Sequence, residues 1–152
     1  MLREKFKESL KDAMKSRNER ATATLRLIQA ALKDRDIAAR GRGKMDGIDE
    51  AEILAMLQTM IKQRKESISH FEQGGRLELA QQEQEEIGII EGFLPKQMGD
   101  AEAAKAVADL IAELGAASIK DMGRTMAALR ERYAGQMDFT KASLLVKQAL
   151  TK

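Results

Sequence analysis

The sequence predicts an all-α protein in two parts, on three observations. Apolar residues recur at spacings of three and four, which places them on one face of a helix. Ala, Leu, Glu, Lys, Gln and Met, the residues that favour helices, dominate the chain. One Pro, one Tyr and four Phe among 152 residues are too few for the strands and turns of an all-β protein. A chain of this length forms one ordinary domain or two small ones.

Residues 1–39 carry two amphipathic patterns. The first is a stripe of helical spacing formed by Leu2, Phe6, Leu10, Ala13 and Met14. Asn18 is a typical N-cap residue, and the stripe that follows it predicts a second helix over about 19–39. Three glycines and three cations in residues 40–47 then predict an exposed, mobile loop.

Two further helices are expected before residue 95. Asp49 can cap the first of them, and Gly74-Gly75 ends it. Arg64 falls in the apolar register of this helix, so its stem is expected to lie along the core while its guanidinium pairs with a carboxylate. A functional role for Arg64 stays open at this point. The next helix is expected to bury Leu77, Ala80, Ile87, Ile90 and Leu94 and to leave its polar middle, residues 81–86, in solvent.

Pro95 marks the clearest boundary, because a proline disfavours helical geometry in the residue before it. We predict an N-terminal four-helix domain over residues 1–94 and a small C-terminal three-helix domain over 95–152. The expected helix caps of the second domain are Asp100, Ser118 with Asp121, and Asp138. Its expected inward side chains are Ala104, Val107, Leu110 and Ile111, then Ile119, Met122, Met126 and Leu129, and finally Leu144, Leu145, Ala149 and Leu150.

The chain lacks the residues of most self-contained active sites. The absence of Cys excludes disulfides, thiolate metal sites and cysteine nucleophiles, and a cytoplasmic protein is the simplest expectation. There is no HExxH, no phosphate-binding Gly-rich loop, no GxSxG and no calcium loop. The single histidine, His70, makes an i, i+4 pair with Glu66 that a metal ion can contact, but a half-exposed surface side chain is expected. We therefore expect no catalytic residue, no metal and no cofactor, and no stretch reaches the ~18 apolar residues of a membrane span.

Charge is distributed unevenly along the chain. Residues 1–44 hold 13 Lys/Arg and 6 Asp/Glu, a net charge of +7. Residues 45–94 hold 4 and 11, a net charge of −7, and residues 95–152 hold 9 and 7, a net charge of +2. One interpretation is that helices of the first two blocks attract each other when they pack. The other is a basic face offered to nucleic acid, and the charges alone leave both open.

Gly123 lies about one turn into the helix expected after Ser118, where glycine costs about 1 kcal/mol relative to Ala. That cost suggests the close approach of another segment, which is either a neighbouring helix or an RNA backbone. In the second case Lys120 and Arg124, four positions apart on one helical face, would contact phosphates.

Several stretches together resemble the YqeY-like family, essentially from end to end. In the N-terminal part they are Thr24-Leu25-Arg26 to Ala30-Ala31-Leu32-Lys33, Lys62 to Ile68, and Phe93-Leu94-Pro95; in the C-terminal part they are Lys120 to Met126, Gly135 to Asp138, and Ser143 to Lys147. The resemblance implies an all-helical fold whose small C-terminal domain is similar to the tail of the GatB subunit of the glutamine-dependent aspartyl/glutamyl-tRNA amidotransferase. In that enzyme the tail contacts tRNA, so the resemblance implies a link to this carbon–nitrogen ligase reaction, with glutamine as amide donor.

The resemblance implies a tRNA-directed accessory protein that is not catalytic alone. Its expected partner is tRNA, together with components of the amidotransferase or of an aminoacyl-tRNA synthetase. The expected RNA contacts are Lys120, Gly123, Arg124, Lys141 and Lys147 of the C-terminal part, with Arg17, Arg20 and Arg26 as second-rank candidates.

Two alternatives stay open, and one residue departs from the family pattern. The first alternative is a helical protein–protein interaction module with no RNA role. The second is an amidotransferase in its own right, which needs a glutaminase site and an ATP site that the sequence does not display. Phe139 follows Asp138 where family members usually have Gly, a departure that bears on the shape of the last turn between helices.

Overall fold

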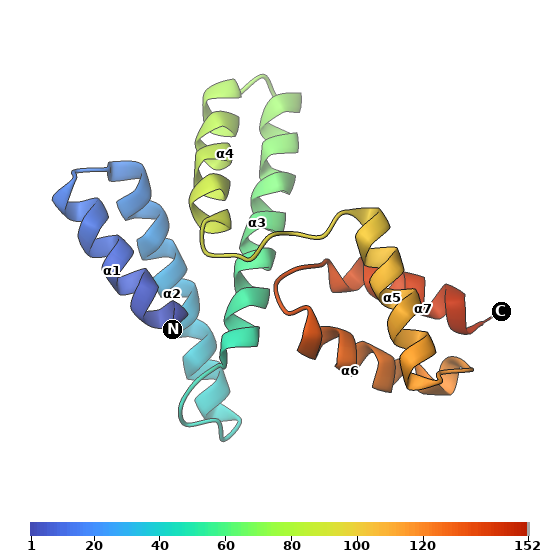
Figure 1. Cartoon of the computed structure of the whole chain (residues 1–152). Helices are drawn as coiled ribbons and strands as arrows, with labels where there is room; N and C mark the ends of the chain where they lie inside the picture. The colour runs from blue at the N-terminus through green and yellow to red at the C-terminus, as the bar shows by residue number, and fades with distance from the viewer. Residues whose placement is uncertain (152) are drawn as a thin grey trace. The chain divides into compact units, whose positions relative to one another are not determined.

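The computed structural model describes residues 1–151, which form seven α-helices and one short 3-10 helix without a strand (Figure 1). The all-α prediction is confirmed. The chain divides into two compact units, Met1–Leu94 and Pro95–Lys152. That either unit folds on its own stays a prediction.

Two helical hairpins make up the N-terminal unit, formed by α1 (Leu2–Lys15), α2 (Glu19–Gly41), α3 (Glu50–Gln73) and α4 (Leu77–Glu91). Helix α1 lies beside α2 and α3 beside α4, and α2 contacts both helices of the second hairpin (Figure 1). The apolar stripes close into one core, in which Phe6, Leu25, Ile28, Ile53, Leu57 and Ile90 are fully buried. Each such side chain stabilises the fold by about 1.5–3 kcal/mol. The ring of Phe6 meets the ring of Phe93 edge to face, with centroids 5.0 Å apart, so α1 packs against the segment after α4.

Helix ends in this unit follow the capping residues that the sequence predicted. The Asn18 side chain accepts a hydrogen bond from the Ala21 N–H at 3.0 Å. Asp49 accepts one from the Glu52 N–H at 2.9 Å, and the Glu52 carboxylate accepts one from the Asp49 N–H, which completes a capping box. These caps satisfy backbone donors that the first turn of a helix leaves free.

The segment between α2 and α3 is exposed over most of the length that its glycines and cations predicted, but its end is held in the core. Residues 42–46 are exposed, but Gly47 and Ile48 are buried. The Asp36 carboxylate, in a residue only 7% exposed, accepts hydrogen bonds from Arg3 at 2.6 and 2.8 Å and from the Ile48 N–H at 2.9 Å. Arg3 also donates to the Ile48 carbonyl at 2.8 Å. Glycine is required at position 47, where φ is +84° and a Cβ would collide with the Asp36 carboxylate. We call these four residues, Arg3, Asp36, Gly47 and Ile48, the Asp36 clamp.

Arg64 has the carboxylate partner that its position predicted. Its Nε donates to Glu86 at 3.0 Å, its Nη1 donates to the Met60 carbonyl at 3.2 Å, and Glu83 lies 3.8 Å away. The expectation that residues 81–86 are solvated is wrong at Glu86, which is 6% exposed, because α4 turns this side chain towards Arg64 on α3. Burial, with the nearby Glu86 carboxylate as a second cause, raises the pKa of Glu83 above its usual value.

Three helices form the C-terminal unit: α5 (Asp100–Leu114), α6 (Met122–Arg132) and α7 (Phe139–Leu150), with the 3-10 turn η1 (Ile119–Asp121) before α6. Helix α7 contacts α5, α6 and η1. The core contains Val107, Leu110, Met126, Leu129 and Val146. Asp138 caps α7 as predicted, since its side chain accepts from the Thr140 N–H at 2.9 Å, whereas Gly99, not Asp100, occupies the N-cap of α5.

Some side chains expected inside the two cores are exposed, namely Met14, Leu77, Ala104, Ile119, Leu144 and Ala149. Two physical reasons account for them. Met14, Leu77 and Ile119 lie at helix ends or in the 3-10 turn, where no other helix is close enough to cover an apolar side chain. Helix α7 buries Ala142, Val146 and Leu150, which recur at a spacing of four. Helix α5 buries Ala106 beside Val107. The predicted inward face was therefore partly wrong in both helices.

Candidate nucleic-acid interface

The five residues expected to contact RNA all lie on the surface of the C-terminal unit. Lys120 belongs to η1, Gly123 and Arg124 to α6, and Lys141 and Lys147 to α7. Within residues 1–151, the side chains of Lys120, Lys141 and Lys147 have no carboxylate within 4.0 Å and no hydrogen-bond partner. These three ammonium groups are therefore available to a ligand.

Lys120 and Arg124 do not share the continuous helical face that their spacing predicted. Ser118 and Asp121 form the expected capping box, but the chain makes a 3-10 turn from Ile119 to Asp121 before α6 begins. The Asp121 carboxylate accepts hydrogen bonds from the N–H groups of Ala117 at 2.9 Å and Ser118 at 3.4 Å. These bonds lower the pKa of Asp121, and Arg124 lowers it further. The carboxylate therefore fixes the turn that carries Lys120.

Arg124 is engaged within its own unit. Its Nη2 donates to Asp121 at 3.1 Å and its Nη1 to the Leu114 carbonyl at 3.0 Å, at the end of α5. The guanidinium therefore holds η1 against the end of the preceding helix. A phosphate contact by Arg124 stays a prediction, and it would have to use donors that these two bonds leave free.

Gly123 faces open space. A Cβ built at this position meets no atom within 4 Å, and the residue is exposed. The interpretation that a neighbouring helix approaches it closely is wrong within the C-terminal unit, where no other helix lies beside it. The approach of an RNA backbone stays a prediction.

Lys141 and Lys147 point to different sides of α7, since six positions of an α-helix turn by about 240°. Together with the break before α6, this means that the five residues are not gathered into one patch. Lys120 is nevertheless near α7, because η1 packs against that helix. Phe139 is half-buried against the C-terminal core and anchors the start of α7 next to its Asp138 cap.

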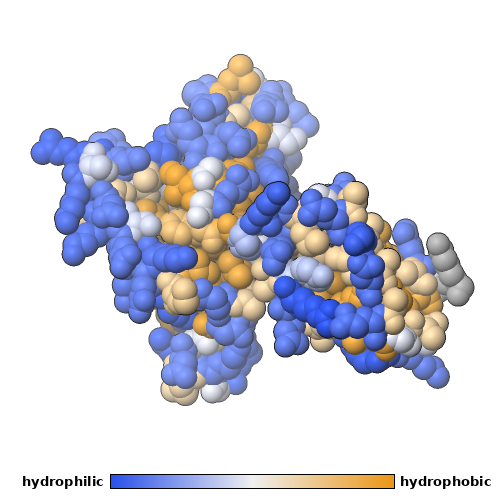
Figure 2. Space-filling view, in the orientation of Figure 1, coloured by the Kyte–Doolittle hydropathy of each residue, from blue (hydrophilic) through white to orange (hydrophobic). Residues whose placement is uncertain are grey.

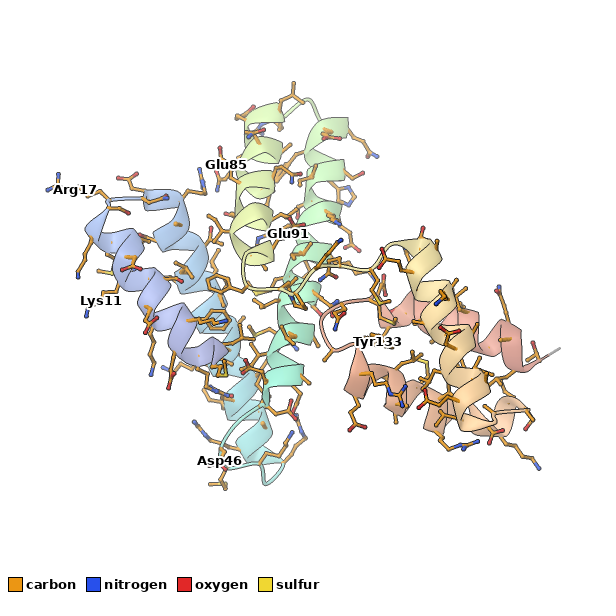
Figure 3. The ribbon with its side chains drawn as sticks, in the orientation of Figure 1. Lys11, Arg17, Asp46, Glu85, Glu91 and Tyr133 are labelled. Carbon is orange, nitrogen blue, oxygen red and sulfur yellow. The ribbon has the colours of Figure 1, made fainter. Side chains whose placement is uncertain are left out.

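The second-rank arginines of the N-terminal unit differ in their surroundings. Arg20 pairs with Glu85 of α4 at 3.2 Å, and Figure 3 shows Glu85 on the side of α4 that faces α2. Lys44 likewise pairs with Glu52. These pairs join the basic first block to the acidic second block, as one interpretation of the charge pattern expects. Arg17 projects from the turn between α1 and α2 in Figure 3, and Arg26 is exposed on α2.

Sequence reasoning missed a groove between α1 and α2. It has a volume of about 330 Å³ and is lined by Arg3, Phe6, Lys7, Gln29, Leu32, Lys33, Asp36 and Arg40. Hydrogen bonds from Arg3, and a further one from Ile48, lower the pKa of Asp36 to about 2, so this carboxylate stays ionised. A signal for the groove was present in the sequence, because Arg26, Lys33 and Arg40 recur at intervals of seven.

Neither a cluster of metal ligands nor a membrane-spanning helix is found among the described residues. Among residues 1–151, no three His, Cys, Asp or Glu side chains converge as metal ligands, and His70 is exposed. None of the helices in this part of the chain combines the length and apolar character needed to cross a bilayer.

Comparison with known proteins gives a family match over almost the whole chain. The model of a family described as Yqey-like protein matches residues 3–150, which confirms the resemblance seen in the sequence. Three relatives are called altered inheritance of mitochondria protein 41, mitochondrial. The protein from Lachancea thermotolerans is 31% identical over 111 residues, 72% of this chain and 57% of its own length. The protein from Vanderwaltozyma polyspora is 28% identical over 124 residues, which are 77% of this chain and 64% of its own length. The protein from Eremothecium gossypii is 31% identical over 108 residues, which are 69% of this chain and 57% of its own length.

Two consequences follow from these relatives. The chain spans only 57–64% of the length of the relatives described above. Their names place them in mitochondria, which contradicts the cytoplasmic location expected from the sequence. The expectation failed because a lack of cysteine excludes disulfides without identifying a compartment.

Proposed function

The chain belongs to the YqeY-like family, and on that premise we propose that it is a tRNA-directed accessory protein, related to the glutamine-dependent tRNA amidotransferase and not catalytic alone. The observation that carries the proposal is the set of available cations on the C-terminal unit, Lys120, Lys141 and Lys147. This unit is the part of the chain that resembles the tRNA-contacting tail of GatB.

Phosphate contacts are the chemistry that such a surface supports. Lysine ammonium groups bind phosphates as point charges and displace condensed counterions from the RNA. Lys120 and Lys141 contribute from η1 and the start of α7, and the open space beside Gly123 leaves room for a backbone to approach α6. Contacts of this kind position an RNA without reading its sequence.

The test is a tRNA titration with the full chain over a series of salt concentrations. The variant Lys120→Glu/Lys141→Glu/Lys147→Glu should bind tRNA at least about tenfold more weakly and show a salt dependence lower by about 2–3 units of slope. Arg124 is left unchanged, because it ties η1 to α5. The matched control is Lys96→Glu/Lys105→Glu/Arg130→Glu, which makes the same change of charge at exposed positions of the same unit. If both variants bind as the wild type does, the C-terminal unit is not the tRNA site.

A protein-interaction module is the second candidate, and one observation favours it. Ile119 of η1 is 47% exposed and Leu144 of α7 is 58% exposed, on two elements that pack together. A pull-down from cell lysate with and without RNase separates the two functions. A partner that survives RNase and is lost in the variant Ile119→Ser/Leu144→Ser would favour the module over the tRNA function.

A further inference from the structure

Four of the eight residues that line the groove between α1 and α2 of the N-terminal unit are cations. The four cations are Arg3, Lys7, Lys33 and Arg40, and they surround an apolar floor that contains the buried side chains of Phe6 and Leu32. Figure 2 shows hydrophilic residues over the α1 side of this unit, and Lys11, one turn beyond Lys7, points into solvent in Figure 3. We call this feature the α1–α2 groove.

The single acidic residue that lines the groove, Asp36, pairs with only one of these four cations, Arg3. Asp36 is occupied by Arg3 and by the Ile48 N–H, within the Asp36 clamp. Lys7 and Lys33 have no ion-pair partner in residues 1–151, and Arg40 makes a single hydrogen bond there, from its Nε to the Met45 carbonyl at 3.3 Å. Arg40 also acts electrostatically on Asp36, so Lys7 and Lys33 are the groove cations without a nearby carboxylate in this part of the chain.

These cations form a row and do not converge on one point. Arg26, Lys33 and Arg40 lie on the same side of α2 at intervals of seven residues, which places them about 10 Å apart along roughly 20 Å of helix. Lys7 faces this row from α1 across the groove. Converging cations suit a small phosphate ligand, whereas an extended row suits a polymer that carries phosphates along its length.

We propose that the α1–α2 groove binds the phosphate backbone of RNA. The identity of the polymer rests on the proposed function, since tRNA is the nucleic acid to which the C-terminal unit points. The groove adds a second contact surface on the N-terminal unit. Lys7, Lys33 and Arg40 are the residues that meet phosphates, and Arg26 extends the surface along α2.

The test uses charge reversal in the full chain. The variant Lys7→Glu/Lys33→Glu should lower the affinity for purified tRNA by about tenfold or more at about 50 mM salt, and should lower the salt slope by about two. Arg3 and Arg40 are kept, because both hold the segment after α2. The matched control is Lys62→Glu/Lys65→Glu, with the same change of charge at two exposed positions of α3 in the same unit. Circular dichroism and urea unfolding check that each variant is folded.

Each outcome supports or overturns the proposal. A loss of affinity in the groove variant that the Lys62/Lys65 control does not share supports the proposal, and if the C-terminal triple variant then binds normally, only the C-terminal assignment fails. A groove variant that binds like the wild type, while the C-terminal variant is weakened, overturns the groove and leaves the proposed function standing. If the groove variant and the Lys62/Lys65 control lose the same affinity, the effect is one of net charge alone, and the groove proposal is overturned. A wild type that binds no tRNA at low salt overturns both.

A second measurement needs no variant. Lysine acetylation of the wild type, followed by mass spectrometry, reports which ammonium groups RNA covers. In the presence of tRNA, the modification of Lys7 and Lys33 should slow severalfold relative to Lys62 and Lys65. Equal protection of all four lysines would overturn the assignment to the groove.

Discussion

Replacing Asp36 with Asn removes a negative charge from the Asp36 clamp and leaves the shape of the side chain almost unchanged. The carboxylate accepts three hydrogen bonds, two from Arg3 and one from the Ile48 N–H. An amide can accept at its oxygen, but its nitrogen is a donor and would face either Arg3 or the Ile48 N–H, which are donors as well. At least one hydrogen bond is therefore lost at a site that water scarcely reaches.

The expected loss of stability has two contributions. Hydrogen bonds from Arg3 are the main cause that lowers the pKa of Asp36 from 3.8 to about 2, a difference equivalent to about 2 kcal/mol. The Arg3 side chain is 35% exposed, so solvent screening reduces this contribution to about 1–2 kcal/mol. A buried donor without an acceptor adds about 1–3 kcal/mol. We expect the free energy of unfolding of Asp36→Asn to be about 3 kcal/mol lower at neutral pH.

Urea unfolding followed by circular dichroism, repeated at several pH values, measures this loss. Because the pKa of Asp36 is lower in the folded chain, the carboxylate stabilises the fold above pH 3.8, and this contribution disappears as the pH falls towards 2. The difference between wild type and variant should therefore be largest at neutral pH and shrink below about pH 4. Glu78→Gln, which breaks the exposed pair with Arg76 in the same unit, should leave the urea midpoint unchanged. Equal midpoints for Asp36→Asn and wild type, or a difference independent of pH, would refute the reasoning.

Four shorter predictions concern the other unusual positions. Gly47→Ala should lower the melting temperature more than Gly75→Ala, because both glycines have positive φ but only the methyl group added at position 47 would collide with the Asp36 carboxylate. Glu83→Gln should be neutral or stabilising at pH 7 and lose this advantage at about pH 4, because the raised pKa of Glu83 means that its ionised form disfavours the fold. A lower stability of this variant than of the wild type at pH 7 would contradict the prediction. Gly123→Ala should raise helix stability by less than the ~1 kcal/mol of a helix interior, because Gly123 is the second residue of α6, and weaker tRNA binding by this variant would indicate a backbone approaching α6. The C-terminal unit expressed alone should give a helical circular dichroism spectrum with marginal thermal stability, and a spectrum without helix would show that it is not autonomous.

The helix caps were predictable from the sequence because a cap involves residues that are close together in the chain. Asn18, Asp49 and Asp138 each accept a hydrogen bond from an N–H two or three positions away. The partner of Arg64 was predictable in kind, since a guanidinium in an apolar register needs a carboxylate. Its identity was not, because Glu86 follows 22 residues later on another helix.

The contacts of the Asp36 clamp could not be predicted from the sequence. Arg3 lies 33 residues before Asp36 and 45 before Ile48, so no local pattern connects them. The register of α7 failed for a different reason. Leu144, Leu145 and Val146 are consecutive apolar residues, and hydropathy alone cannot decide which of them faces the core. The candidate RNA contacts all lie on the surface, but the 3-10 turn before α6 separates residues that a continuous helix would have aligned.

The contact between Phe6 and Phe93 has a consequence for synthesis of the protein. The two rings lie 87 residues apart in the chain, so the partner of Phe6 is made almost last in the N-terminal unit. At a synthesis rate of roughly 5–20 residues per second, Phe93 is added to the chain about 4–17 s after Phe6. During that interval the ring of Phe6 lacks its edge-to-face neighbour, so this part of the apolar face of α1 stays uncovered until the end of the N-terminal unit has been made.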